Sequence, residues 1–321
     1  MKAMILAAGL GTRLRPLTLE RAKPAIPLLG KPLVIRLLEK LAQHGATDFR
    51  LNLHHLPRTI EVLFRAGPWD SLPVSFSYEP HILGTAGGLK ANEAFFDQGT
   101  FLMVNGDIVM EFPLKEAVAF HRQREAMATL VLYPQQAPYR HSPIRIDEEG
   151  HFRNFKGIWP GGNPRAETYV FTGVHILEPE IFRFIPEGQF YEINDQVYLH
   201  ALRNGMNVYG FPVEGYWNDL GDPRRYLEAQ KAMFTREGSI LPVYISPDAS
   251  LDDRVAFRPF VSVGPGCVLE RDCFVENSIL WDKVRVRSRT SVRNSIVGAN
   301  MTVEGDCIDR IVTRNGEASI A

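Results

Sequence analysis

Short apolar runs alternate with segments of helical periodicity over the N-terminal two-thirds of the chain. Residues 4–8 form an apolar run ending at a glycine, typical of a buried strand. Between residues 32 and 45 leucines recur at helical spacing, and Gly45 is placed to end that helix. Further strands are predicted at 48–53, 74–79, 101–104, 128–133 and 208–213, a hairpin at 144–155, and helices at 58–65, 89–96, 114–125, 196–204 and 224–234. This order predicts an α/β domain with a mostly parallel sheet and helices on both faces.

The periodicity changes to six residues from Ile245 onward. Aliphatic or aromatic residues occupy every sixth position up to Val275, and small or apolar residues follow each of them by four. After a five-residue step the pattern restarts at Leu280. This period is the hexapeptide signature of a parallel β-helix. We therefore expect an N-terminal domain of residues 1–237 and a β-helix domain of residues 238–321.

Composition and charge narrow the class of protein. The chain has 321 residues, of which 45% are hydrophobic and 23% charged, and its net charge is −1. These values give no reason to expect a nucleic-acid or membrane partner. No apolar run approaches 18 residues and no leader pattern begins the chain, so we expect a cytoplasmic enzyme. Cys267, Cys273 and Cys307 fall on the inward series of the repeat, and we interpret them as small buried hydrophobes.

The loop after the first predicted strand has the chemistry of a phosphate site. Gly9 and Gly11 allow a sharp turn that brings backbone N–H groups close to a ligand. Arg13 and Arg15 offer planar forks of donors suited to phosphate oxygens, and Lys23 adds a further cation. The spacing matches neither the dinucleotide-binding nor the Walker pattern. The glycines alone are equally consistent with an ordinary strand–helix turn, but with the cations they indicate a polyphosphate pocket.

A second glycine-rich junction and a strand-end aspartate add candidate site residues. The run from Gly84 to Gly88 precedes the predicted helix 89–96, where backbone can approach a ligand. A carboxylate at Glu79 could accept hydrogen bonds from guanine, or it could serve at the surface or as a cap. Asp107 follows the buried strand 101–104, and ligands bind at the carboxyl ends of strands in open α/β sheets. Mg²⁺ prefers such carboxylate oxygens.

Several of these strings together resemble one enzyme family. L-A-A-G-L-G-T-R-L-R-P-L-T at residues 6–18, K-P at 23–24, L-G-T-A-G at 83–87 and W-N-D-L-G-D-P at 217–223 resemble the motifs of the sugar-1-phosphate nucleotidylyltransferases. Many members of that family also carry a left-handed β-helix. The resemblance implies a Rossmann-like (GT-A-like) core that forms an NDP-sugar and pyrophosphate from an NTP and a sugar 1-phosphate.

The resemblance also implies roles for individual residues. Arg13, Lys23 and Asp107 are the implied catalytic residues, and Asp107 and Asp219 the implied ligands of Mg²⁺. The implied nucleotide-binding residues are Leu6, Ala8, Gly9, Gly11, Thr12, Arg13, Glu79, Gly84 and Thr85. The implied sugar-binding residues are Asn105, Lys156, Glu167 and Gly173.

The chain departs from the family pattern at one motif. Many members have E-K-P where this chain has Phe155-Lys156-Gly157, so Lys156 has no acidic residue before it. The glycine- and proline-rich loop 157–167 that follows is interpreted as an insertion or lid. Asn194 and Asp195 are interpreted as N-cap residues of the helix 196–204.

The resemblance leaves the substrates open. GTP with mannose 1-phosphate ranks first, ahead of glucose-1-phosphate thymidylyl- or uridylyltransferase and N-acetylmuramate-1-phosphate uridylyltransferase activity. A non-catalytic regulatory paralogue is the alternative of another class, favoured by the altered motif at Lys156. Retention of Arg13, Lys23, Asp107 and Asp219 argues against it. Hexapeptide repeats also occur in acyltransferases, but no histidine follows His200, so we expect the β-helix to support homo-oligomerisation instead.

Overall fold

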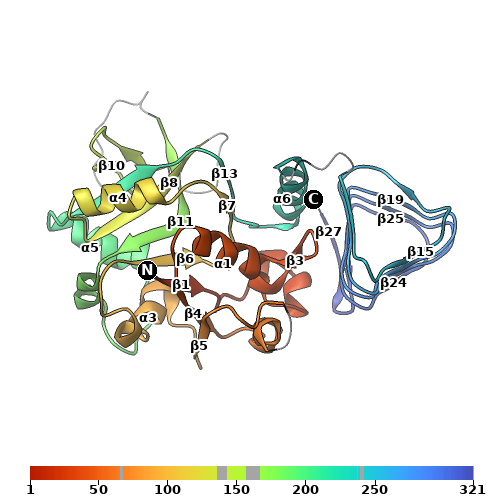
Figure 1. Ribbon diagram of the computed structural model, residues 1–321, viewed down its shortest axis with the longest axis horizontal. Helices are drawn as coiled ribbons and strands as arrows, with labels where there is room; N and C mark the ends of the chain where they lie inside the picture. The colour runs from red at the N-terminus through yellow and green to blue at the C-terminus, as the bar shows by residue number, and fades with distance from the viewer. Residues whose placement is uncertain (66–67, 136–142, 157–166, 237, 239–241, 321) are drawn as a thin grey trace. The chain divides into compact units, whose positions relative to one another are not determined.

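The computed structural model describes residues 1–65, 68–135, 143–156, 167–236, 238 and 242–320. These residues form two compact units (Figure 1). The first unit contains Met1–Gly9, Leu37–His55 and Leu63–Asn218, and the second contains Leu10–Arg36, Leu56–Val62 and Asp219–Ala321. All of the predicted lid 157–167 except Glu167 lies outside the described residues. The predicted domain boundary at residue 237 stays a prediction.

A seven-stranded sheet forms the centre of the first unit. Its strands are β1 (Lys2–Leu6), β4 (Asp48–Leu53), β5 (Val74–Tyr78), β6 (Phe101–Asn105), β8 (Ala128–Pro134), β11 (Tyr169–Leu177) and β12 (Val208–Pro212). Their order is β12-β8-β11-β6-β1-β4-β5. Only β11 runs antiparallel to its neighbours among these strands, so the prediction of a mostly parallel sheet is confirmed.

Both faces of this sheet are buried at its central strands. Consecutive residues Ala3, Met4 and Ile5 of β1 are fully inaccessible, and β6 shows the same continuous burial. A strand buried on both faces needs cover on both sides, which explains why these strands are unbroken apolar runs. Within the unit, α3 contacts β1, while α4 contacts β8, β11 and β12.

The helices in the part of the chain that the structure describes are short. They are α1 (Leu33–Gln43), α2 (Arg58–Glu61), α3 (Gly84–Lys90), α4 (Lys115–Gln123), α5 (Tyr198–Arg203) and α6 (Pro223–Arg236). None of them is long and apolar enough to cross a membrane.

Two helix predictions were wrong in their bounds. The helix predicted at residues 89–96 instead spans Gly84–Lys90, and Glu93–Phe95 forms a separate 3₁₀ turn. It begins at Gly84 because the N–H groups of Ala86 and Gly87 donate to the Tyr191 carbonyl and fix the glycines in the first turn. The helix predicted at 196–204 begins with a π-helical turn, Ile193–Val197. Asn194 and Asp195 therefore lie inside that turn and are not its N-cap.

Two antiparallel pairs complete the first unit. β9 (Arg145–Ile146) pairs with β10 (Phe152–Asn154), as the predicted hairpin requires. β7 (Val109–Glu111) pairs with β13 (Tyr216–Asn218), with Val109 opposite Asn218.

Stacked coils of short parallel strands fill most of the second unit, drawn in blue in Figure 1. The first sheet has β14 (Val243–Ile245), β17 (Val261–Val263), β20 (Ile279–Leu280), β23 (Ile296–Val297) and β26 (Arg310–Thr313), with β27 (Gly316–Ser319) turning back antiparallel. The second has β15 (Ser250–Leu251), β18 (Val268–Leu269), β21 (Arg285–Val286) and β24 (Thr302–Val303). The third has β16 (Ala256–Phe257), β19 (Phe274–Glu276), β22 (Ser291–Arg293) and β25 (Cys307–Ile308). These stacks are those of the predicted left-handed β-helix.

The inward series of the repeat forms the core of the coils. Valines dominate it, and Cys267, Cys273 and Cys307 are buried among them. Burial raises the pKa of the Cys267 thiol to about 11 and also raises the pKa values of the other two thiols. The interpretation of the cysteines as small buried hydrophobes is therefore confirmed.

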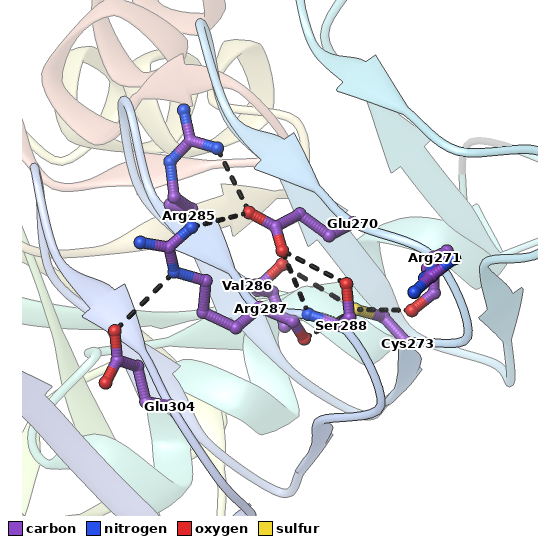
Figure 2. Close-up of polar contacts among 8 residues, drawn as sticks. All are labelled: Glu270, Arg271, Cys273, Arg285, Val286, Arg287, Ser288 and Glu304. Atoms are coloured by element: carbon purple, nitrogen blue, oxygen red, sulfur yellow. Dashed lines mark hydrogen bonds and ion pairs between the residues drawn. The ribbon is translucent and has the colours of Figure 1, made fainter.

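Polar contacts connect successive coils on the outside. Figure 2 shows Glu270, whose Oε1 accepts from Arg285 and Arg287 at 3.2 and 3.0 Å, and whose Oε2 accepts from the Ser288 N–H and hydroxyl. The Ser288 N–H and then Arg287 lower the pKa of Glu270 to about 2. Since Arg285 and Arg287 lie one coil beyond Glu270, this contact follows directly from the repeat.

Candidate active site

The glycine loop of the second unit turns at Gly11. Gly11 has φ +61°, in the left-handed region, and its carbonyl accepts from the Thr18 hydroxyl at 2.8 Å. A Cβ at Gly11 would lie 2.8 Å from Thr18 Cγ2, so both the turn and the packing require glycine. A short 3₁₀ turn, Thr12–Leu14, follows with Leu14 buried and Arg13 exposed. The loop thus presents Thr12 and Arg13 to solvent.

Three predicted site residues of the second unit meet around Asp219. Lys23 is only 7% exposed, and its Nζ donates to the backbone carbonyl of Asp219 at 3.3 Å. A Cβ built on Gly221 would lie 3.2 Å from Asp219 Oδ1 and 3.3 Å from Arg13 Nη1. Both groups therefore lie in the space that a side chain at position 221 would need, and glycine there keeps that space open.

Arg225 joins this group, and the sequence reasoning missed it. Asp222 caps α6, since its Oδ1 accepts from the Arg225 N–H at 3.0 Å, as the Asp-Pro pair at the helix start predicts. The Arg225 guanidinium forms an ion pair with Asp219 Oδ1. Burial lowers the pKa of Arg225, and the neighbouring Arg13 cation lowers it further. One signal was available, because a cation in the first turn of a helix opposes the helix dipole and needs an anionic partner.

In the first unit, Asn105 and Gly173 lie against each other. Asn105 ends β6, and the following Gly106 N–H donates to the Leu6 carbonyl at the end of β1, at 2.9 Å. Gly173 has φ +84° at a register irregularity in β11. A Cβ there would lie 2.6 Å from the Asn105 amide nitrogen. Two predicted sugar-binding residues are thereby brought together, and Asp107, half-buried, follows two residues after Asn105.

The glycines of the second loop have a packing reason of their own. The Thr85 hydroxyl donates to Glu192 Oε2 at 2.6 Å and accepts from the Ile193 N–H at 2.8 Å. A Cβ on Gly87 would lie 2.4 Å from the Gln189 carbonyl oxygen. Glycine at this position therefore allows the segment 189–193 to pack closely on the start of α3, whether or not a ligand also approaches.

Within the first unit, Glu79 is a buried support of the second glycine loop and, through Asn52, of the segment that follows β1. It is 4% exposed, its Oε1 accepts from the Asn52 amide at 2.7 Å, and its Oε2 accepts from the Leu83 N–H at 3.0 Å. Asn52 in turn accepts from the Ala7 N–H at 2.8 Å. The surface role considered for Glu79 is wrong, because the residue is buried, and the capping role is wrong as well, because α3 has no side-chain cap. The hydrogen bonding of Glu79 to the base of the nucleotide stays a prediction.

Lys156 finds its acidic partner elsewhere in the chain. Its Nζ forms an ion pair with Asp195, which lies in the π-helical turn before α5. The position where relatives carry an acid is occupied by Phe155, which is buried against Phe152 at a ring distance of 5.1 Å. Glu167 accepts from the Tyr169 hydroxyl at 2.7 Å, and no described contact joins Glu167 to Asn105 or Gly173. The four predicted sugar-binding residues are thus only partly assembled.

The family assignment follows from comparison with known proteins. The family described as Nucleotidyl transferase matches residues 2–236, and the GMPPB C-terminal domain matches residues 239–313. The chain belongs to the nucleotidyl transferase family. The resemblance to the sugar-1-phosphate nucleotidylyltransferases is thereby confirmed, and so is the prediction that the chain is an enzyme.

Two named relatives match all or nearly all of the chain. A UTP–glucose-1-phosphate uridylyltransferase from Synechocystis is 29% identical, and the match covers 100% of this chain and 95% of the relative. A mannose-1-phosphate guanyltransferase from Schizosaccharomyces pombe is also 29% identical, with 94% and 87% covered. A solved structure titled as a putative glucose-1-phosphate thymidylyltransferase from Bacillus anthracis is 22% identical, with a TM-score of 0.60 over 72% of this chain and 94% of that one, which confirms the Rossmann-like fold alone.

Proposed function

We propose that this nucleotidyltransferase joins GTP and mannose 1-phosphate to form GDP-mannose and pyrophosphate. The observation that carries the proposal is the convergence of Arg13 and Lys23 on Asp219, residues from sequence-distant loops with the chemistry that a nucleoside triphosphate requires. The mannose-1-phosphate guanyltransferase relatives support this base and sugar, and the uridylyltransferase relative supports UTP with glucose 1-phosphate as the second candidate.

The reaction is an in-line displacement at phosphorus. An oxygen of the sugar phosphate attacks the α-phosphorus of the NTP, and the bond from that phosphorus to the bridging oxygen of the β-phosphate breaks. Such transfers depend on positioning and charge neutralisation and need no covalent protein nucleophile. Arg13 and Lys23 hold the departing pyrophosphate. The glycine loops with Leu6, Ala8 and Thr12 bind the nucleotide, and Thr85 and Glu79 keep the second loop in shape.

We assign Asp107 and Asp219 as ligands of Mg²⁺, because carboxylate oxygens suit a hard divalent cation. Asp107 follows the carboxyl end of β6 and is half-buried, and Asp219 directly follows β13, so each offers carboxylate oxygens. When bound, the ion neutralises charge that develops on the phosphate oxygens. Asn105, Gly173, Glu167 and Lys156 are assigned to the sugar phosphate, with Lys156 oriented by Asp195.

The remaining proposals concern assembly and the regulatory alternative. We assign homo-oligomerisation to the β-helix, because a short solenoid leaves end coils to be covered. The retained Arg13, Lys23, Asp107 and Asp219 disfavour a non-catalytic paralogue, and the ion pair of Lys156 supplies the acid that the altered motif lacks.

Pyrophosphate release tests the proposal. The protein is incubated with each of five NTPs and a set of sugar 1-phosphates in the presence of Mg²⁺. We expect release with GTP and mannose 1-phosphate, and its loss in Asp107→Asn. Release only with UTP and glucose 1-phosphate selects the second candidate. No release in any combination, together with thermal stabilisation by a nucleotide sugar, selects the regulatory paralogue.

A further inference from the structure

Arg225 occupies an unusual position beside the proposed metal ligand. Its guanidinium holds Asp219 Oδ1, and the side chains of Arg225 and Asp219 are only 20% and 13% exposed. The point where a Cβ of Gly221 would stand lies 3.3 Å from Arg13 Nη1 and 3.5 Å from Arg225 Nη1. Two guanidinium groups and one carboxylate oxygen therefore lie close to the same point beside Gly221, and Arg225 is the one paired with the oxygen.

The cations around Asp219 suit an anion with several oxygens. Arg13 and Arg225 carry like charges, and Lys23 is held on the carbonyl of the same aspartate. The planar forks of the two arginines match the oxygens of a polyphosphate, which can accept from several donors at once. Glu228 on the same helix is an anion that favours the charge of Arg225, but it is exposed, whereas Asp219 is buried.

We propose that Arg225 is a third cationic ligand of the triphosphate, held on Asp219 in the free protein and transferred to phosphate when a divalent cation takes Asp219. This inference rests on the proposed function. The metal and Arg225 compete for Asp219 Oδ1, so the Arg225 fork is released when the metal–phosphate complex arrives. The ion pair thus keeps Arg225 oriented and shields the acidic ligand before substrate binds.

Binding of inorganic tripolyphosphate tests this role without turnover. Titration calorimetry with excess Mg²⁺ compares the wild type with Arg225→Gln, Arg225→Lys and Arg13→Gln. We expect Arg225→Gln to weaken binding about 10- to 100-fold, the range for losing hydrogen bonds to a charged group. Arg225→Lys keeps the charge but lacks the fork, so we expect an intermediate loss. Arg224→Gln is the matched control, because Arg224 is its exposed neighbour on the same helix, and we expect binding within about twofold of wild type.

A metal readout tests the competition separately. Binding of Mn²⁺ to the free protein, followed by electron paramagnetic resonance, should become several-fold tighter in Arg225→Gln and stay unchanged in Arg224→Gln. The reason is that removing Arg225 frees Asp219 for the cation.

The outcomes separate this inference from the proposed function. If tripolyphosphate fails to bind the wild type, the triphosphate site and the inference are both wrong. If Arg13→Gln weakens binding while Arg225→Gln matches the wild type in both readouts, the triphosphate site stands and Arg225 is a structural ion pair. Arg225→Lys keeps the test valid if Arg225→Gln does not fold.

Discussion

Two carboxylates of the second unit each hold arginine side chains, yet they are assembled differently. Glu270 accepts from Arg285 and Arg287 of the next coil, at the open surface of the β-helix (Figure 2). Asp219 forms an ion pair with Arg225, and its backbone carbonyl accepts a hydrogen bond from Lys23. Arg13 lies nearby, beside Gly221. The first cluster repeats with the period of the solenoid and links one coil to the next. The second gathers residues from distant loops around a carboxylate that is itself buried, where charges act more strongly.

The way in which an ion pair is assembled indicates whether it serves stability or function. Exposed pairs between coils contribute little individually to stability, and losing one leaves the partners solvated. Several cations collected from separate loops around one buried carboxylate indicate a candidate site for an anionic ligand.

Asp219→Asn should give the largest loss. We expect the rate of pyrophosphate release to fall about 10²- to 10³-fold, the cost of removing one element of electrostatic stabilisation. Glu270→Gln removes an equally well paired carboxylate and should leave the rate within about twofold of the wild type. A comparable loss of rate in Glu270→Gln, with its fold intact, would contradict the distinction.

Acid should destabilise the first unit before the β-helix. His175 is fully buried with its Nδ1 hydrogen-bonded to the Tyr198 hydroxyl at 2.6 Å, and burial lowers its pKa from 6.5 to about 3. A depressed folded pKa gives stability that is complete above pH 6.5 and is lost as the pH falls towards 3, because the unfolded chain binds the proton first. We expect a decrease of a few kcal/mol in the free energy of unfolding across this window. Denaturant unfolding at successive pH values measures it.

A His175→Gln variant provides the control for that prediction. Glutamine can still hydrogen-bond Tyr198 but does not titrate, so the curve of unfolding free energy against pH should flatten between pH 6.5 and 3. An unchanged slope in this variant would mean that other groups cause the acid sensitivity.

Asp195→Asn should produce a moderate and selective effect. Loss of the exposed ion pair leaves Lys156 less oriented, so we expect KM for the sugar 1-phosphate to rise about three- to fivefold, with KM for the NTP unchanged. Asp147→Asn, which breaks an ion pair with Arg153 on the β9–β10 hairpin, is the matched control and should change neither constant. Equal increases in both KM values would instead indicate a general structural change.

The smallest effect belongs to Glu270. Its folded pKa of about 2 lies below the ordinary 4.5, so its contribution to stability is present above pH 4.5 and is lost as the pH falls towards 2. Melting temperatures of wild type and Glu270→Gln should therefore differ slightly at pH 6 and converge near pH 2. A difference that grows with acid would show that the carboxylate does not stabilise the coils.

Sequence patterns revealed those features whose causes are local or periodic. The β-helix followed from the six-residue period, because each coil repeats the same inward positions. The strands of the sheet followed from their apolar runs. The start of α3 could not be predicted, since three glycines have poor helix propensity and form a helix only because Tyr191 accepts from its first turn.

In the candidate site, too, the residues in local motifs could be predicted, and those defined by contacts between distant residues were missed. Gly11, Arg13, Lys23 and Asp219 could be found because their motifs match a family. Asp195 was missed as the partner of Lys156, since the two are 39 residues apart and no periodicity relates them. Arg225 was missed because the sequence does not show that Arg225, Arg13 and Asp219 come together. All three lie beside Gly221, which has no side chain to keep them apart.

The decisive experiment is pyrophosphate release from GTP and mannose 1-phosphate with Mg²⁺, compared between Asp219→Asn and Glu270→Gln. We expect the wild type and Glu270→Gln to release pyrophosphate at similar rates and Asp219→Asn to lose nearly all activity. Full activity in a folded Asp219→Asn protein would contradict this expectation, because the convergence on Asp219 would then have no part in the reaction.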